Sequence, residues 1–230
     1  MLDRQIKVLK SEGIHRIILI GGYRSEMLCR EDAELRINPA YSETNMVYTL
    51  FCAESDLDDE AIVSYGDIVY SRAILSKLLK SDADIAVTID KDWKSYWFAR
   101  SNNPLDDAET LQLSSEGRIT EIGQKPNTME EIEGQYMGLM KFSAKGAAMM
   151  SKVYHEAKKA ENLCGKPVKK AQLTDLLQTM IHSGYRVDAV TVQGGWVEVD
   201  TISDLFLDVT KERLRLIKNS IKQLSKHLSL

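Results

Sequence analysis

IVSYGD, at residues 62–67, is the stretch that decides the fold, because a short apolar run leads through a glycine into a single acid. The apolar residues predict a buried strand of a parallel sheet, since such strands read as continuous apolar runs. In open α/β sheets, ligands bind at the carboxyl ends of the strands. Gly66 would let the backbone approach a ligand closely. We therefore expect Asp67 to hold a metal ion against a phosphate.

A second isolated acid, Asp200, closes a similar stretch, GGWVEVDT at 194–201. Two carboxylates at two strand ends can bind one divalent cation, and Mg²⁺ prefers such oxygen ligands. Both acids also have simpler explanations. Asp67 could be a turn acid after a strand, and Asp200 with Thr201 could begin the C-terminal helix.

The segments around these two stretches alternate between helical and strand patterns. In the first part of the chain, apolar spacing predicts helices at 1–12, 43–54 and 71–80, and strands at 16–23, 34–38 and 84–90. This alternation favours an α/β fold with a doubly wound, mostly parallel sheet.

The middle of the chain has shorter apolar runs separated by turns. We predict short strands near 95–101, 109–113, 117–123 and 135–143, which would form a meander over residues 92–143 at one edge of the sheet. Helices are predicted at 144–161 and 170–183, and strands at 186–192 and 196–199. A long or broken amphipathic helix is expected at 202–228. The expected organisation is one domain spanning residues 1–230.

Composition excludes several classes of protein. The 230 residues carry a formal charge of −4, which argues against a general nucleic-acid binder with a basic face. No apolar run approaches the ~18–20 residues that cross a bilayer. The three cysteines, Cys29, Cys52 and Cys164, are far apart, as is typical of free thiols in a reducing cytoplasm. The four scattered histidines give no pattern for zinc.

Lys125 is a third candidate, because EIGQKP at 121–126 places it in a loop between Gly123 and Pro126. A loop lysine can hold a phosphate as a point charge. The simpler interpretation is a solvated surface lysine, since lysines are mostly exposed.

Aromatic residues cluster in DWKSYW at 92–97 and recur at Tyr136 and Trp196. Exposed rings such as Trp97 can enclose a cationic amine by cation–π attraction, although core packing is the default. Glu198 beside such rings would strengthen recognition of an ammonium group, and Arg100 could pair with an anionic phosphoryl oxygen.

Several stretches together resemble a known family. They are MLDRQIKVLKSEGI, ILIGGY, SETNMVYTL, VSYGDIVYSRAIL, DWKSYW, GQYMGLMKFSAKGA and GGWVEVDTISDL, which span nearly the whole chain. The chain resembles the nucleotidyltransferases of the nucleotide-diphospho-sugar transferase fold, and within them the phosphocholine and aminoalkylphosphonate cytidylyltransferases.

The resemblance implies roles for particular residues. Asp67 and Asp200 would hold Mg²⁺ on the α-phosphate of CTP, Asn45 would contact the nucleotide, and Tyr65 and Gly66 would border its pocket. Lys125 would bind the phosphate of the acceptor. The implied reaction joins CTP to a phosphocholine-like or aminoalkylphosphonate acceptor, with release of pyrophosphate.

The same resemblance implies a departure at the N-terminus. Members of the family begin with a strand, a glycine-rich loop bearing an arginine, and a Pro-Lys pair, and Met1 aligns just after these elements. We therefore expect a sheet without that strand and little transferase activity from the chain as given. Two alternatives stay open: a sugar-1-phosphate nucleotidyltransferase, and a catalytically inactive binding or regulatory homologue. The C-terminal helix offers an interface for a homodimer.

Overall fold

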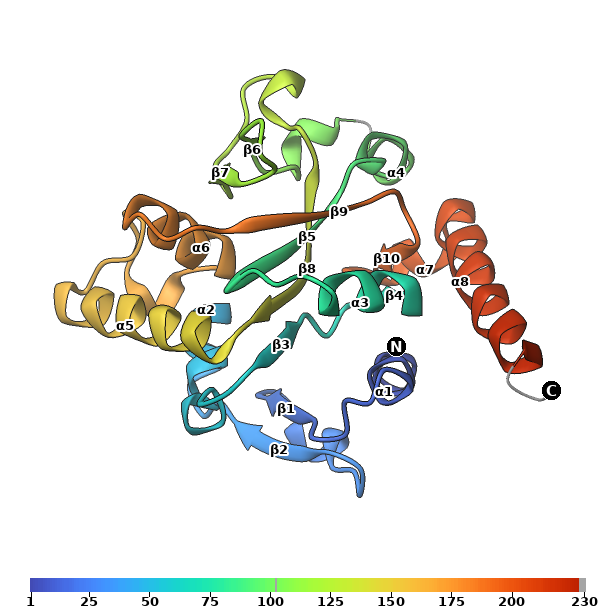
Figure 1. The fold of residues 1–230 in the computed structure, drawn as a ribbon, viewed down its shortest axis with the longest axis horizontal. Coiled ribbons are helices and arrows are strands. Elements are labelled where there is room, and N and C mark those ends of the chain that lie inside the picture. Colours follow the sequence, from blue (N-terminus) through green and yellow to red (C-terminus); the bar gives the residue numbers. More distant parts are fainter. Residues whose placement is uncertain (102, 228–230) are drawn as a thin grey trace.

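Four strands form the central sheet in the order β3-β8-β5-β9 (Figure 1). The computed structural model describes residues 1–101 and 103–227, with side chains described as far as Lys218. The four strands are β3 (Ala61–Ser64), β8 (Gln135–Phe142), β5 (Ile85–Asp90) and β9 (Asp188–Val192). β8 runs antiparallel to both of its neighbours, whereas β5 and β9 are parallel. The sheet is therefore mixed, and the expectation of a mostly parallel sheet is wrong in that respect.

The strand that changes the character of the sheet is β8. The sequence predicts a strand at 135–143, but in a meander at the edge, whereas β8 lies between β3 and β5. Every residue of β8 except Tyr136 is buried. A strand that is buried on both faces shows no alternation, so its pattern reveals neither its direction nor its neighbours.

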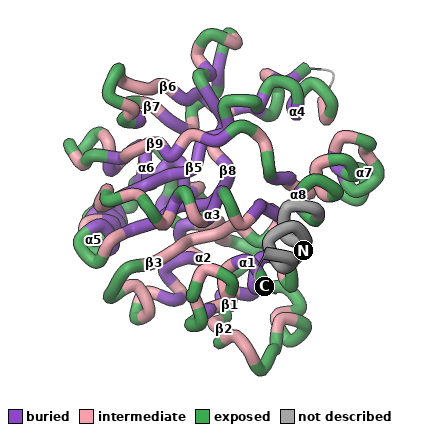
Figure 2. The backbone as a smooth tube through the Cα atoms, turned by 45° about the vertical axis from the view of Figure 1, so that its right-hand side comes forward, coloured by how far each residue is buried: buried purple, intermediate pink, exposed green. Residues whose placement is uncertain are grey.

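Helices cover both faces of this sheet. On one face, α2 (Met46–Phe51), α5 (Ala144–Ala160) and α6 (Leu173–His182) contribute to one apolar cluster. On the other, α1 (Leu2–Ser11), α3 (Arg72–Leu79) and α4 (Trp93–Arg100) contribute to a second cluster. Successive residues of β5 point to opposite clusters, Ile85 and Val87 to the first and Ala86 to the second. Figure 2 shows β5 and β8, the two inner strands of the sheet, as buried.

Residues 93–100 form helix α4 and not the strand predicted near 95–101. Aromatic residues favour strands by propensity. The buried residues Trp93, Tyr96 and Trp97, however, have the i, i+3, i+4 spacing of one helical face. Burial of that face therefore overrides the local propensity. The neighbouring strands β6 (Leu111–Leu113) and β7 (Ile119–Ile122) pair as an antiparallel hairpin, as predicted.

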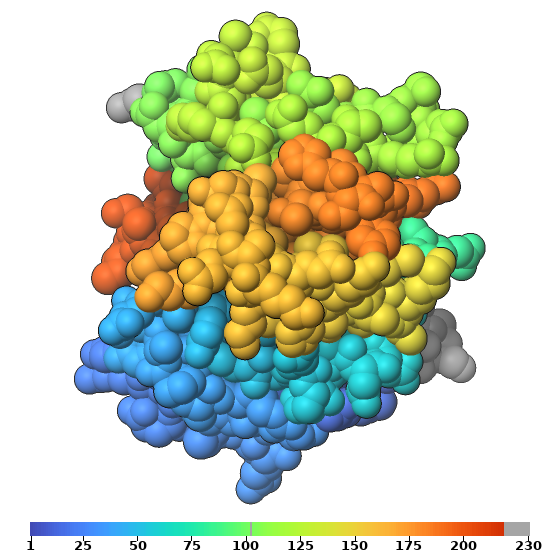
Figure 3. All heavy atoms as spheres, turned by 90° about the vertical axis from the view of Figure 1, so that its left-hand side faces the viewer, coloured from blue at the N-terminus to red at the C-terminus, as the bar shows by residue number. Residues whose placement is uncertain are grey.

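The N-terminal strands stand apart from the central sheet. β1 (Ile18–Gly21) and β2 (Glu34–Ile37) pair in parallel as a separate two-stranded sheet. A largely apolar, partly open cavity of about 680 Å³ lies between β1 and β3 and is also lined by residues of α1 and α2. Within the described residues, β1 pairs only with β2, and β3 pairs only with β8. In Figure 3 the N-terminal residues form one end of the molecule, α5 and α6 the middle, and the segment around β6 and β7 the other end.

Two short antiparallel strands, β4 (Ile68–Tyr70) and β10 (Trp196–Glu198), lie beside the C-terminal helices. The predicted helix at 202–228 is broken into α7 (Ile202–Phe206) and α8 (Asp208–His227), and residue 228 lies outside the described residues. The break occurs at Leu207, which has extended backbone angles. The β4–β10 pair lies next to both predicted metal ligands, since Asp67 precedes β4 and Asp200 follows β10.

Candidate active site

Pairing of β4 with β10 brings Asp67 and Asp200 into the same region. Asp67 lies in the loop between β3 and β4, just before Ile68, which pairs with Glu198. The backbone N–H of Val199 donates to the carbonyl of Asp67 over 3.0 Å, and Asp200 is the next residue. The two acids therefore come together across an antiparallel ladder, not at the ends of two parallel strands.

One oxygen of the half-buried Asp67 carboxylate has no hydrogen-bond partner among the described residues. This oxygen, Oδ1, is itself buried. Burial raises the pKa of Asp67 and the charge of Asp200 raises it further, while a hydrogen bond to the residue's own backbone and the charge of Arg100 oppose the rise. An orphaned carboxylate oxygen beside a second carboxylate suits a hard cation such as Mg²⁺.

Arg100, at the end of α4, binds the acids of β10 and the following loop. Its guanidinium donates to Oε2 of Glu198 over 2.6 Å and to Oδ2 of Asp200 over 2.5 Å, and its Nε lies 3.8 Å from Oδ1 of Asp204. The side chain is only 7% exposed and lies over the ring of Tyr96, 5.2 Å from its centroid. Burial by itself would lower the pKa of Arg100, but its bond to Glu198 holds it above the usual value. In the structure this arginine therefore neutralises carboxylates, whereas the sequence suggested a phosphoryl oxygen as its partner.

Glu198 is paired with Arg100 and lies near enough to Asp200 and Asp67 for their charges to affect it. Burial raises the pKa of Glu198 to about 7, with Arg100 opposing and Asp200 and Asp67 adding to the rise. The hydroxyl of Tyr96 donates to the carbonyl of Glu198 and accepts from its N–H, at 3.0 and 3.1 Å. Helix α4 therefore fixes both the backbone and the side chain of this residue.

Asp204 positions the backbone of Asp200 and is a residue that our sequence reasoning missed. Its Oδ2 accepts from the N–H groups of Asp200 and Thr201, at 3.1 and 2.8 Å, while the Thr201 hydroxyl caps the N–H of Asp204. The T-x-x-D pattern at 201–204 has the spacing of a capping box. That local signal could have identified Asp204.

The two tryptophans belong to the core, which corrects the expectation of exposed rings around an amine. Trp97 is 4% exposed and Trp196 is 0% exposed, and their ring centroids lie 6.2 Å apart. The indole N–H of Trp196 donates to Oδ2 of the fully buried Asp90 over 2.7 Å. Tyr136 packs edge-on against Tyr65, with centroids 5.6 Å apart. Core packing, the default for aromatic residues, is what the structure shows for these tryptophans.

Four of the predicted residues line the 680 Å³ cavity between β1 and β3: Asn45, Tyr65, Gly66 and Asp67. Asn45 also caps α2, because its Oδ1 accepts from the N–H of Met46 over 2.8 Å. A Cβ added to Gly66 would meet no atom within 4 Å, and Gly66 does not have a left-handed φ. The protein itself therefore does not require glycine at position 66, whereas a ligand close to the backbone would.

Lys125 is exposed and lies apart from this cluster. Its ammonium group donates to the carbonyls of Leu105 and Asp106, the second over 2.8 Å. A lysine that contacts phosphate would have to leave these carbonyls, so its assignment to the acceptor stays a prediction.

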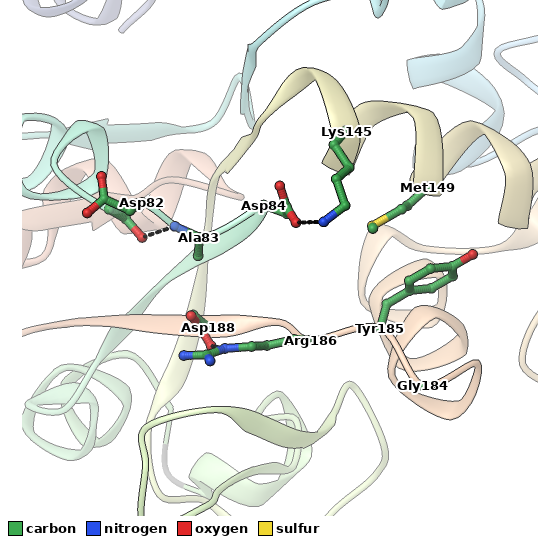
Figure 4. Close-up of a pocket in the computed structure, with 10 residues that line it drawn as sticks. Asp82, Ala83, Asp84, Lys145, Met149, Gly184, Tyr185, Arg186 and Asp188 are labelled. Carbon is green, nitrogen blue, oxygen red and sulfur yellow. Dashed lines mark hydrogen bonds and ion pairs between the residues drawn. The ribbon is translucent and has the colours of Figure 1, made fainter.

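A second cavity of about 560 Å³ lies where β5 and β9 begin, at the opposite ends of these strands from Asp90 and Val192 (Figure 4). Four of its five charged lining residues form ion pairs with one another, and Asp82 is the fifth. Lys145 binds Asp84, and Arg186 binds Asp188, each over 2.7 Å. Paired charges leave little affinity for an ionic ligand, so this cavity is not the candidate site.

Larger metal sites and membrane-spanning helices are both absent from the described residues. The described part of the chain contains no cluster of three or more His, Cys, Asp or Glu residues that could hold a metal. A carboxylate pair remains compatible with Mg²⁺, which proteins often bind through one or two carboxylates plus substrate phosphates. Among the described helices, none is both long and apolar enough to span a bilayer.

Comparison with known proteins gives one clear sequence relative and several structural ones. The chain is 36% identical over 222 residues to the CTP:phosphoglutamine cytidylyltransferase of Campylobacter jejuni, covering 92% of this chain and 87% of that protein. No family model matches the chain.

Two solved structures show the same fold. The inositol-1-phosphate CTP transferase of T. maritima has a TM-score of 0.70 at 17% identity and covers 94% of this chain and 82% of its own. The CTP:phosphocholine cytidylyltransferase of Streptococcus pneumoniae has a TM-score of 0.61 at 16% identity, with coverage of 94% and 84%.

Proposed function

The chain belongs to the nucleotidyltransferase family as a cytidylyltransferase, and we propose that it transfers a cytidylyl group from CTP to a small phosphorylated acceptor. The observation that carries the proposal is the 36% identity to the C. jejuni enzyme over 92% of the chain. The meeting of Asp67 and Asp200 across β4 and β10 supports it independently.

The proposed acceptor is a phosphorylated amino-acid amide of the phosphoglutamine type. The name of the C. jejuni enzyme favours this class over the phosphocholine or aminoalkylphosphonate that the sequence suggested. Burial of Trp97 and Trp196 points the same way, because a quaternary ammonium group is bound by exposed aromatic faces.

In the proposed reaction, an oxygen of the acceptor phosphate attacks the α-phosphorus of CTP. A new P–O bond forms, the bond from the α-phosphorus to the bridging oxygen breaks, and pyrophosphate leaves with that electron pair. No general base is required, since the attacking oxygen is anionic near pH 7. The protein therefore contributes mainly positioning and electrostatic stabilisation.

Asp67 and Asp200 would hold Mg²⁺, which, when bound, neutralises charge that develops on the transferred phosphoryl group. Asn45, Tyr65 and Gly66 would border the nucleotide in the cavity that they line with Asp67. Arg100 would keep Asp200 and Glu198 in place through its two short bonds. Lys125 would bind the acceptor phosphate after leaving its two carbonyl partners.

Pyrophosphate release tests the proposal directly. The full chain is assayed with CTP and Mg²⁺ against phosphoglutamine, phosphocholine, aminoethylphosphonate and glucose-1-phosphate, and the highest of the four rates is expected with phosphoglutamine. Asp67→Asn should abolish it, whereas Asp58→Asn, an exposed acid outside the site, should not. Turnover only with glucose-1-phosphate would favour a sugar nucleotidyltransferase. CTP binding without any turnover would favour an inactive homologue.

A further inference from the structure

A buried glutamine of the first helix reaches the loop that carries Asp67. Gln5 lies in α1 and is only 6% exposed. Its Nε2 donates to the carbonyl of Tyr65 over 2.7 Å and to the carbonyl of Ile68 over 2.5 Å. These partners are 60 and 63 residues away in the sequence. Both N–H groups of the amide are therefore used on one short loop.

The two carbonyls flank the functional pair Gly66-Asp67. Between them the backbone has no side chain at Gly66 and faces the open cavity there. The loop is also held by backbone bonds, from Tyr65 N–H to Gly138 over 2.8 Å and from Val199 N–H to Asp67 over 3.0 Å. Gln5 is the side chain that holds both ends of the loop at once.

We propose that Gln5 is a positioning residue for Asp67, which fixes the loop so that its unpartnered Oδ1 meets the metal ion. This proposal rests on the metal role of Asp67 in the proposed function. A carboxylate must be placed accurately for Mg²⁺, which tolerates little deviation from octahedral geometry. Outer residues that orient metal ligands typically contribute about 10–100-fold to metal affinity or activity.

The test compares four variants of the full chain. Gln5→Leu removes both donors at similar volume, and Gln5→Met does so with an unbranched side chain in case leucine prevents folding. Val8→Ala is the matched control, because Val8 is a buried apolar residue of the same helix that makes no hydrogen bond to the loop through its side chain. Asp67→Asn removes the proposed ligand itself.

Binding of Mn²⁺–CTP, followed by electron paramagnetic resonance without acceptor, gives a readout that does not depend on turnover. We expect the Gln5 variants to weaken this binding by about 10-fold, to raise the Mg²⁺ concentration for half-maximal rate equally, and to leave the KM for the acceptor unchanged. Val8→Ala should change none of these.

The outcomes separate this inference from the function on which it rests. If Asp67→Asn weakens Mn²⁺–CTP binding but the Gln5 variants behave like Val8→Ala, positioning by Gln5 is refuted and the metal role of Asp67 stands. If Asp67→Asn leaves binding unchanged, the metal assignment and the inference both fail. Loss of folding in both Gln5 variants would mean a structural role only, which also overturns the inference.

Discussion

Replacement of Gly66 by alanine should affect ligand binding and protein stability in opposite directions. The added Cβ meets no protein atom within 4 Å, and the backbone there does not have a left-handed φ. Alanine in such a place stabilises a protein by about 0.4–1 kcal/mol, because the unfolded chain loses conformational freedom. We therefore expect Gly66→Ala to melt at the same temperature as the wild type or slightly higher.

Activity should change in the opposite direction. The methyl group would project into the cavity that Gly66 lines with Asp67, where the nucleotide phosphates are proposed to lie. A displacement of about 1 Å in a reacting group can cost about 10²-fold in rate, so kcat/KM for CTP should fall by about that factor. Pyrophosphate release at varied CTP, together with thermal melting, measures both effects.

Gly146→Ala provides the contrast within the same chain. A Cβ at Gly146 would lie 1.9 Å from the carbonyl oxygen of Asp84, so this variant should lose stability strongly. Unchanged kcat/KM in Gly66→Ala, at full stability, would refute the claim that ligand approaches the backbone there.

Three further predictions follow from the charges and the core. Arg100→Leu leaves Glu198 without its cation and should lower the free energy of unfolding by about 3 kcal/mol in urea denaturation, with part of the loss restored by Mg²⁺. The ion pair of Arg215 is exposed, so an equal loss in Arg215→Leu would contradict this prediction. Burial raises the pKa of Glu109 to about 7, so the stability contributed by its protonated form is present below the unfolded value of 4.5 and is lost as pH rises through 7. Glu109→Gln should flatten the pH dependence of urea midpoints between pH 5 and 8, and an unchanged slope would refute the raised pKa. Trp97→Phe should lower the melting temperature but leave the KM for the acceptor unchanged, because Trp97 is a core residue. A large rise in that KM would instead support the predicted enclosure of the acceptor's amine by aromatic rings.

Much of the secondary structure could be predicted because local periodicity and turn residues decide it. Helix α1, for example, ends at Ser11 shortly before Gly13, which has a left-handed φ of 84°. The direction and place of β8 could not be predicted, since a strand buried on both faces carries no sign of its neighbours. The sequence predicts a strand near 95–101, but the helical spacing of Trp93, Tyr96 and Trp97 and the burial of that face decide for a helix at 93–100.

The candidate site shows the same division between local and long-range signals. Asp67 and Asp200 stood out as isolated acids beside glycines, but only the pairing of β4 with β10 brings them together. Gln5 carries no local signal at all, because its role depends on carbonyls 60 and 63 residues away. Such contacts come from tertiary packing, which propensity and periodicity do not contain.

The charge arrangement also indicates which carboxylate of the site has an oxygen available to bind a cation. Glu198 and Asp200 share the guanidinium of Arg100, and Asp204 is occupied with the N–H groups of Asp200 and Thr201. Asp67 differs from all three, because its buried Oδ1 has no partner while the neighbouring Asp200 adds negative charge. A buried carboxylate in this position is costly unless a cation joins it. A cation that arrives with a nucleoside triphosphate would remove this cost, so burial of the Asp67 carboxylate should favour binding of metal and nucleotide together.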